Sequence, residues 1–64
     1  MLKQSDMTEK AKRVFDSVTG EPATSGEIAW VNNLTDSCCQ LILTQLAMAG
    51  LIKENIKEKT YQNI

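Results

Sequence analysis

Histidine is absent from this chain of 64 residues, and its only two cysteines, Cys38 and Cys39, are adjacent. Zinc sites need spaced cysteine or histidine ligands, and a nucleophilic cysteine needs a neighbouring base. The sequence offers neither arrangement, and its three glycines form no glycine-rich phosphate loop. We therefore expect no metal site, no cofactor and no enzymatic activity. Both cysteines are expected to be reduced, structural thiols, with redox sensing or an intermolecular disulfide as the alternative.

Long apolar runs are also absent. No stretch approaches the roughly 18 apolar residues that indicate a membrane span, and the first residues, MLKQSDMTEKAKR, lack the apolar region of a signal peptide. These absences predict a cytoplasmic protein. The length predicts a single domain over residues 1–64, with a flexible lead-in over residues 1–7. A core this small would gain buried surface from association with a second copy.

Positive charge is scarce as well. Seven Lys and Arg residues against eight Asp and Glu residues give a formal net charge of −1, whereas proteins that bind nucleic acids usually carry a basic excess. Residues 36–49 contain no basic residue. Six of the seven cations form two groups, Lys10, Lys12 and Arg13 near the start of the chain and Lys53, Lys57 and Lys59 near its end.

Two stretches before residue 32 have the apolar spacing of an amphipathic helix. In the first, residues 8–18, the apolar positions follow the i, i+3, i+4, i+7 pattern: Ala11, Val14, Phe15 and Val18. The second opens with Thr24 and Glu27 in the T-x-x-E relation of a capping box, in which each side chain satisfies a free backbone N–H group of the other residue. This helix is expected to continue to Val31, with Ile28, Ala29 and Val31 making apolar contacts.

A third, longer helix is predicted from Asp36 to about Ala49. Thr35 precedes it as an N-cap. Its inward face is formed by residues at helical spacing: Cys39, Ile42, Leu43, Leu46 and Ala49. Asn32 and Asn33 are expected to make the tight turn from the second helix to the third, because asparagine tolerates positive φ.

A glycine and a short polar segment follow the third helix. Gly50 can adopt the left-handed conformation that ends a helix. The segment LIKENIKEKTYQNI then predicts a small β-hairpin with strands near residues 51–55 and 60–63. A short C-terminal helix is the alternative, since the hairpin tip lacks an Asn-Gly signal. The predicted fold is therefore mainly α with a small β-hairpin, an α+β domain with three helices.

This order of helices, tight turn, glycine and hairpin resembles that of the small winged helix-turn-helix regulators of bacteria and their phages. The resemblance rests on the segment from Thr24 to Ala29, on Leu34 and Thr35, and on the run from Cys39 to Ile52. It implies a three-helix winged helix-turn-helix domain. It also implies a DNA-binding protein of transcription regulation, encoded by a prophage or plasmid and acting as a homodimer.

The chain departs from the family pattern at two places. In the turn, Asn33 stands where glycine is usual, and Asn32 stands where the family buries an aliphatic residue. Trp30 or Val31 is expected to fill that space through a small rotation of the second helix. The other departure is the third helix, which usually presents Lys or Arg and here has none.

If the chain binds double-stranded DNA, the resemblance places the third helix in the major groove. Its outward positions would then meet base edges: Ser37, Cys38, Gln40, Leu41 and Thr44. Gln40 can pair with adenine through two hydrogen bonds, and the hydroxyls can contact bases or phosphates. The hairpin would hold the DNA backbone through Lys53, Lys57 and Lys59. Ordinary solvated surface is the alternative for all these residues, and it is the favoured interpretation of the cations near the start of the chain.

The alternative function is a winged-helix protein-interaction module, such as an antirepressor or adaptor that docks on another regulatory protein without binding DNA. The uncharged third helix supports this interpretation. Trp30, Leu41 and Met48 are apolar residues on faces that the core does not need, and tryptophan and methionine are enriched in protein interfaces. A homodimer contact would cover some of the same residues, and Trp30 could instead complete the core.

Overall fold

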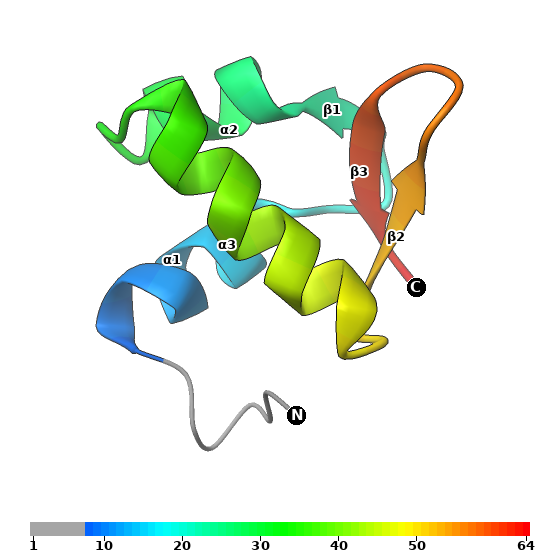
Figure 1. Cartoon of the computed structure of the whole chain (residues 1–64), viewed down its shortest axis with the longest axis horizontal. Coiled ribbons are helices and arrows are strands. Elements are labelled where there is room, and N and C mark those ends of the chain that lie inside the picture. Colours follow the sequence, from blue (N-terminus) through cyan, green and yellow to red (C-terminus); the bar gives the residue numbers. More distant parts are fainter. Residues whose placement is uncertain (1–7) are drawn as a thin grey trace.

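The computed structural model describes residues 8–64, so the predicted lead-in over residues 1–7 lies outside it. Three helices and three short strands follow one another along the chain, as Figure 1 shows: α1 (Glu9–Ser17), β1 (Ala23–Thr24), α2 (Ser25–Val31), α3 (Asp36–Met48), β2 (Ile52–Asn55) and β3 (Thr60–Asn63). The α+β class predicted from the sequence is confirmed.

Each helix is preceded by a threonine N-cap, and for α2 and α3 this is the threonine that the sequence predicts. The Thr8 hydroxyl accepts a hydrogen bond from the Ala11 N–H at the start of α1, 3.2 Å away. At α2 the capping box is reciprocal: the Glu27 N–H donates to Thr24 Oγ1 over 3.2 Å, and the Thr24 N–H donates to Glu27 Oε1 over 2.9 Å. At α3 the Thr35 hydroxyl accepts a hydrogen bond from the Cys38 N–H over 3.2 Å. These caps satisfy backbone donors that an α-helix leaves free at its N-terminus.

Two residues with positive φ enclose α3. Asn33, in the turn from α2, has φ 57°, and Gly50, after the last turn of α3, has φ 79°. The Leu51 N–H then donates to the Leu46 carbonyl over 3.0 Å, which closes the end of the helix. Because the chain reverses at both ends of α3, the helix packs against α2 on one side and leads directly into the hairpin on the other.

The sheet contains one strand more than the sequence predicts. β2 and β3 form the predicted antiparallel hairpin, and β1 pairs antiparallel with the other edge of β3, so the strand order is β1-β3-β2. β1 has only two residues, too few for the alternation of apolar and polar residues that marks a strand. Its pairing ties the segment before α2 to the end of the chain.

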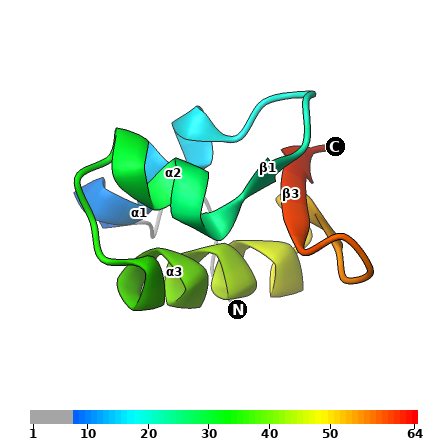
Figure 2. The ribbon, with the colours of Figure 1, turned by 90° about the horizontal axis from the view of Figure 1, so that it is seen from above.

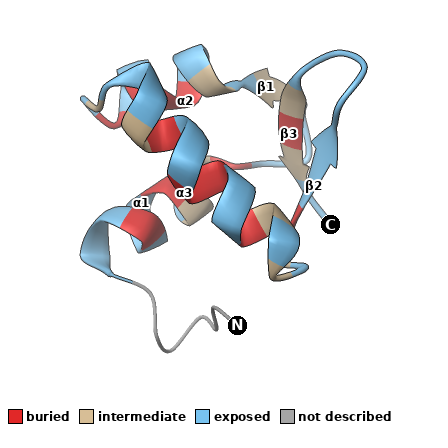
Figure 3. Ribbon diagram, in the orientation of Figure 1, coloured by how far each residue is buried: buried red, intermediate tan, exposed pale blue. Residues whose placement is uncertain are grey.

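The core lies between α3 and the layer formed by α1 and α2, with the sheet closing one end (Figure 2). The inward sides of the helices are the buried ones (Figure 3). The largest side chains that are fully buried in this core are those of Leu43, Leu46, Val14 and Cys39. Phe15, predicted to be part of the same helix face, is only half-buried at the edge of the core.

The prediction that Trp30 or Val31 fills the space near the turn is wrong. Trp30 is 85% exposed and Val31 is 68% exposed, whereas Asn32 itself is buried. The Asn32 Nδ2 group donates to Ser17 Oγ and to the Ile28 carbonyl, each over 2.9 Å. These hydrogen bonds offset the cost of removing the amide from water, so the polar side chain of Asn32 itself occupies the position.

Candidate functional site

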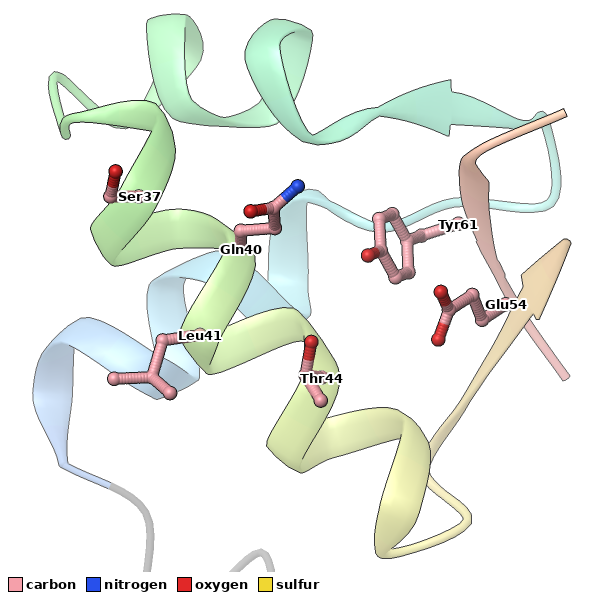
Figure 4. A pocket seen from close by; sticks show the side chains of 6 residues that line it. All are labelled: Ser37, Gln40, Leu41, Thr44, Glu54 and Tyr61. Carbon is pink, nitrogen blue, oxygen red and sulfur yellow. The ribbon is translucent and has the colours of Figure 1, made fainter. Parts of the chain in front are cut away.

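A groove of about 410 Å³ lies between the outward face of α3 and the β2–β3 hairpin. Four of its lining residues come from α3 at helical spacing and two come from the hairpin: Ser37, Gln40, Leu41, Thr44, Glu54 and Tyr61. Figure 4 shows Glu54 and Tyr61 reaching from the strands toward α3, where Gln40 and Thr44 face them. We call this feature the α3–hairpin groove.

Strand alternation decides which hairpin residues face α3. Ile52 is buried and Glu54 lines the groove, so both point to the α3 side of the sheet. Successive side chains of a strand point to opposite faces, which puts Lys53 on the far face. There it pairs with Gln62 across the ladder. The charged hairpin residue in the groove is therefore an anion, Glu54, and the sheet separates Lys53 from the outward face of α3.

The structure brings together four of the five predicted α3 residues, because all but Cys38 line the α3–hairpin groove. Cys38 is half-buried and packs against the core instead. Lys57 and Lys59 are exposed in the turn between β2 and β3. They are thus placed at the hairpin tip, beyond the walls of the groove. The cations of α1 are exposed and line neither wall.

Glu54 and Tyr61 were not predicted as site residues. Two features of the hairpin identify them as groove residues. Glu54 is two positions from the buried Ile52 and so shares its face of the strand, and Tyr61 is the cross-strand partner of Glu54. Recognising these features requires the register of the hairpin, which the turn sequence does not specify.

The N-terminus of α3 carries a second anion, held against α2. The Ser25 hydroxyl donates to Asp36 Oδ1 over 2.8 Å. This charge-assisted hydrogen bond turns the carboxylate toward α2 and partly satisfies it. Asp36 therefore does not line the α3–hairpin groove. The groove surface itself contains one carboxylate, four uncharged polar groups and one leucine, and no cation.

Tyr61 provides a neutral hydroxyl to this surface. Burial raises the pKa of the phenol above its ordinary value of 10.0, and the negative charge of Glu54 raises it further. A hydrogen bond with the Thr44 side chain lowers this pKa and opposes part of the shift. The phenol is therefore protonated at neutral pH and can both donate and accept a hydrogen bond. With Gln40 and Thr44, it gives the groove three groups that recognise polar edges without charge.

Cys39 lies on the inward face of α3 and is fully buried. Burial, together with the nearby charges of Asp36 and Cys38, raises the pKa of this thiol from 9.0 to about 11. Since the thiolate is the reactive form, Cys39 is expected to be inert at neutral pH. The structural role predicted for it agrees with its complete burial.

The raised pKa of Cys39 predicts a loss of stability in alkali. Between pH 9 and about pH 11 the unfolded thiol ionises while the folded thiol keeps its proton. The unfolded state then binds fewer protons, so the free energy of unfolding falls as pH rises through this window. Thermal unfolding followed by circular dichroism at several pH values tests this. A Cys39→Ala variant should show a shallower fall, and an unchanged slope in that variant would contradict the assignment.

A second groove, of about 530 Å³, lies on α2 and is called the α2 groove below. It is lined by Gly26, Glu27, Trp30 and Val31. Trp30, one of the residues predicted to contact a partner protein, therefore lies in the α2 groove. Leu41, another of them, lines the α3–hairpin groove. Met48 is 77% exposed near the C-terminal end of α3 and lines neither groove. The three predicted interface residues therefore do not line one groove.

Within residues 8–64, no group of three or more His, Cys, Asp or Glu side chains is placed to hold a metal ion. The helices in that range are also too short and too polar to cross a membrane. Comparison of the chain with protein-family models, with curated proteins and with solved structures found no match. The two grooves must therefore be interpreted from their own chemistry.

Proposed function

We propose that this chain is a winged-helix transcriptional regulator that binds double-stranded DNA, with α3 in the major groove and the hairpin tip on the DNA backbone. The order of helix, helix, tight turn, helix, glycine and hairpin supports this proposal, because the resemblance to winged-helix regulators rests on it. The observation that carries the proposal is the exposed polar stripe of α3, flanked by a hairpin whose tip holds two lysines.

The side chains of the stripe can make hydrogen bonds and apolar contacts with the edges of DNA bases. Gln40 offers a donor and an acceptor that match the N7 and N6 positions of adenine. The hydroxyls of Ser37 and Thr44 match single donors or acceptors, and the exposed side chain of Leu41 suits the methyl group of thymine. This set favours A·T over G·C base pairs, because no arginine or lysine is available for the guanine edge. A homodimer would place two such helices on a palindromic site.

The charges around the stripe predict weak binding to the backbone. Lys57 and Lys59 can neutralise two phosphates, and Glu54 opposes them. Each neutralised phosphate contributes about −0.9 to the slope of log K against log salt. The expected slope is therefore about −2 or shallower, much smaller than that of a strongly basic regulator.

A salt-dependent titration tests the proposal. Fluorescence anisotropy of a labelled A·T-rich duplex, measured from about 50 to 200 mM salt, should show binding that weakens with the shallow slope given above. A Lys57→Gln, Lys59→Gln double variant should bind more weakly and lose most of the slope, while Lys12→Gln should behave as wild type. Absence of binding to any duplex at the lowest salt would refute DNA binding by this chain.

The cation-free groove also supports a second candidate function, a protein-interaction module of the antirepressor or adaptor kind. A groove with Glu54 and no lysine or arginine suits a basic segment of a partner protein as well as it suits a base edge. The two functions predict opposite effects of the Glu54 charge, because phosphates are repelled by it and a basic protein segment is attracted.

A further inference from the structure

The α2 groove combines an exposed indole with a carboxylate. Its apolar part is Trp30 and Val31, and Gly26 leaves the groove open beside them because it has no side chain. Covering a tryptophan side chain removes about 150–250 Å² of surface from water. Trp30 is therefore the largest apolar contact surface that α2 offers to another molecule.

Glu27 gives this groove a fixed charge. Its Oε1 atom accepts hydrogen bonds from the Thr24 N–H over 2.9 Å and the Thr24 hydroxyl over 3.2 Å. The capping box thus holds the side chain in one orientation. The other carboxylate oxygen has no hydrogen-bond partner among residues 8–64, and Glu27 is exposed. An acceptor that is already oriented loses less conformational entropy when it binds a donor.

We propose that the α2 groove binds a segment of a partner protein in which an arginine or lysine lies beside an apolar side chain. The apolar side chain would pack on Val31 and the edge of the indole. The cation would lie against the indole face, where cation–π attraction is strongest for tryptophan, and donate to the free oxygen of Glu27. The groove contains no cation of its own, so its charge favours a basic segment over an acidic one.

A second copy of the chain is a poorer occupant of this groove. Stable protein interfaces bury about 1,200–2,000 Å² in total, and only four residues line the α2 groove. A two-fold pairing of α2 with itself would also bring the two Glu27 carboxylates into one small interface without a compensating cation. A short basic segment needs less area and neutralises that charge.

The α2 groove shares no lining residue with the α3–hairpin groove. The inference therefore does not depend on DNA binding, and the two can fail separately. The probe is a short fluorescein-labelled peptide of alternating leucine and arginine. Its matched control contains citrulline in place of arginine, which keeps the size and planar shape, removes the charge and replaces one NH2 donor group of the guanidinium with a carbonyl oxygen. Anisotropy is measured at low salt on the full chain.

Two variants assign the binding to the groove. Trp30→Ala removes an exposed side chain, so the fold should be retained. Glu27→Gln removes the charge while glutamine still serves in a capping box. We expect the arginine peptide to bind wild type at least about five-fold more tightly than the citrulline peptide. The reason is that citrulline has no positive charge to attract the indole face or the Glu27 carboxylate. Glu27→Gln should lose that preference, and Trp30→Ala should lose the binding. Circular dichroism checks that both variants are folded.

Several results would overturn the proposal. These are no binding of the arginine peptide, equal binding of the two peptides, or undiminished binding by folded Trp30→Ala. Self-association of wild type that Trp30→Ala abolishes would assign the groove to a second copy. Loss of duplex binding in folded Trp30→Ala would assign it to nucleic acid. Failure of duplex binding in wild type, with the peptide preference intact, would refute the proposed function and leave this inference standing.

Discussion

Leu43→Ala is expected to leave most of the protein unfolded at physiological temperature. Leu43 is 0% exposed at the centre of α3, where the helix packs on the core. Truncating a fully buried leucine to alanine costs about 3–5 kcal/mol, because the transfer free energy of the lost atoms adds to that of the cavity. The core of a domain this small supplies only about 3–5 kcal/mol in total.

Urea and thermal unfolding, followed by circular dichroism, measure this loss. Leu41→Ala is the matched control, because it removes the same atoms from the same helix at a side chain that is 62% exposed. Surface substitutions of this kind usually change stability by less than about 0.5 kcal/mol. A Leu43→Ala variant with a melting temperature close to that of Leu41→Ala would mean that α3 is not anchored as described.

The inward face of α3 was predictable because its signals are local. The spacing of Cys39, Ile42, Leu43 and Leu46 defines the buried stripe, and Thr35 and Gly50 mark where the helix starts and stops. The same holds for the capping box of α2. Each signal depends on residues within a few positions of one another, so no knowledge of the tertiary structure is needed to read it.

The features that the sequence did not reveal depend on contacts between distant segments. The pairing of Ala23 with Tyr61 joins residues far apart in the chain, and a two-residue strand has no alternation of its own. The burial of Asn32 depends on Ser17, which α1 supplies from fifteen positions away. Composition alone favours an aliphatic residue or a neighbouring tryptophan in that space. The hydrogen bonds that make asparagine acceptable there exist only once α1 and α2 are packed.

The register of the hairpin is the missing information that matters most for function. The sequence shows Lys53, Lys57 and Lys59 as one basic group, and a shift of one residue would exchange the faces of Lys53 and Glu54. The observed register puts Glu54 opposite Tyr61, inside the α3–hairpin groove. The basic group predicted for the hairpin is therefore reduced to the two lysines of the tip, and the groove beside α3 contains an acidic residue instead.

Charge reversal on the hairpin is expected to change duplex affinity strongly and in opposite directions. Glu54→Lys replaces the anion of the groove with a potential phosphate contact. Reversing both tip lysines, in a Lys57→Glu, Lys59→Glu variant, removes two contacts and adds repulsion. With a slope of about −0.9 per contact, each contact is worth roughly tenfold between 1 M salt and 50 mM salt. We therefore expect about tenfold tighter binding for the first variant and at least about a hundredfold weaker binding for the second at low salt.

The sign of the Glu54 effect separates the two proposed functions. Anisotropy of one labelled duplex with wild type, Glu54→Lys and Glu54→Gln should give affinities that rise in the order wild type, Gln, Lys. Lys53→Gln is the matched control, because Lys53 lies on the far face of the sheet and its loss should have a much smaller effect than loss of either tip lysine.

If the α3–hairpin groove instead receives a basic protein segment, Glu54→Lys must weaken that complex, since the carboxylate is the only charge that the groove offers. Duplex affinity that is unchanged across the series would remove the groove from the DNA interface. Recovery of wild-type affinity by Glu54→Lys in a Lys57→Gln background would show that one cation on either part of the hairpin serves the same phosphate-binding role.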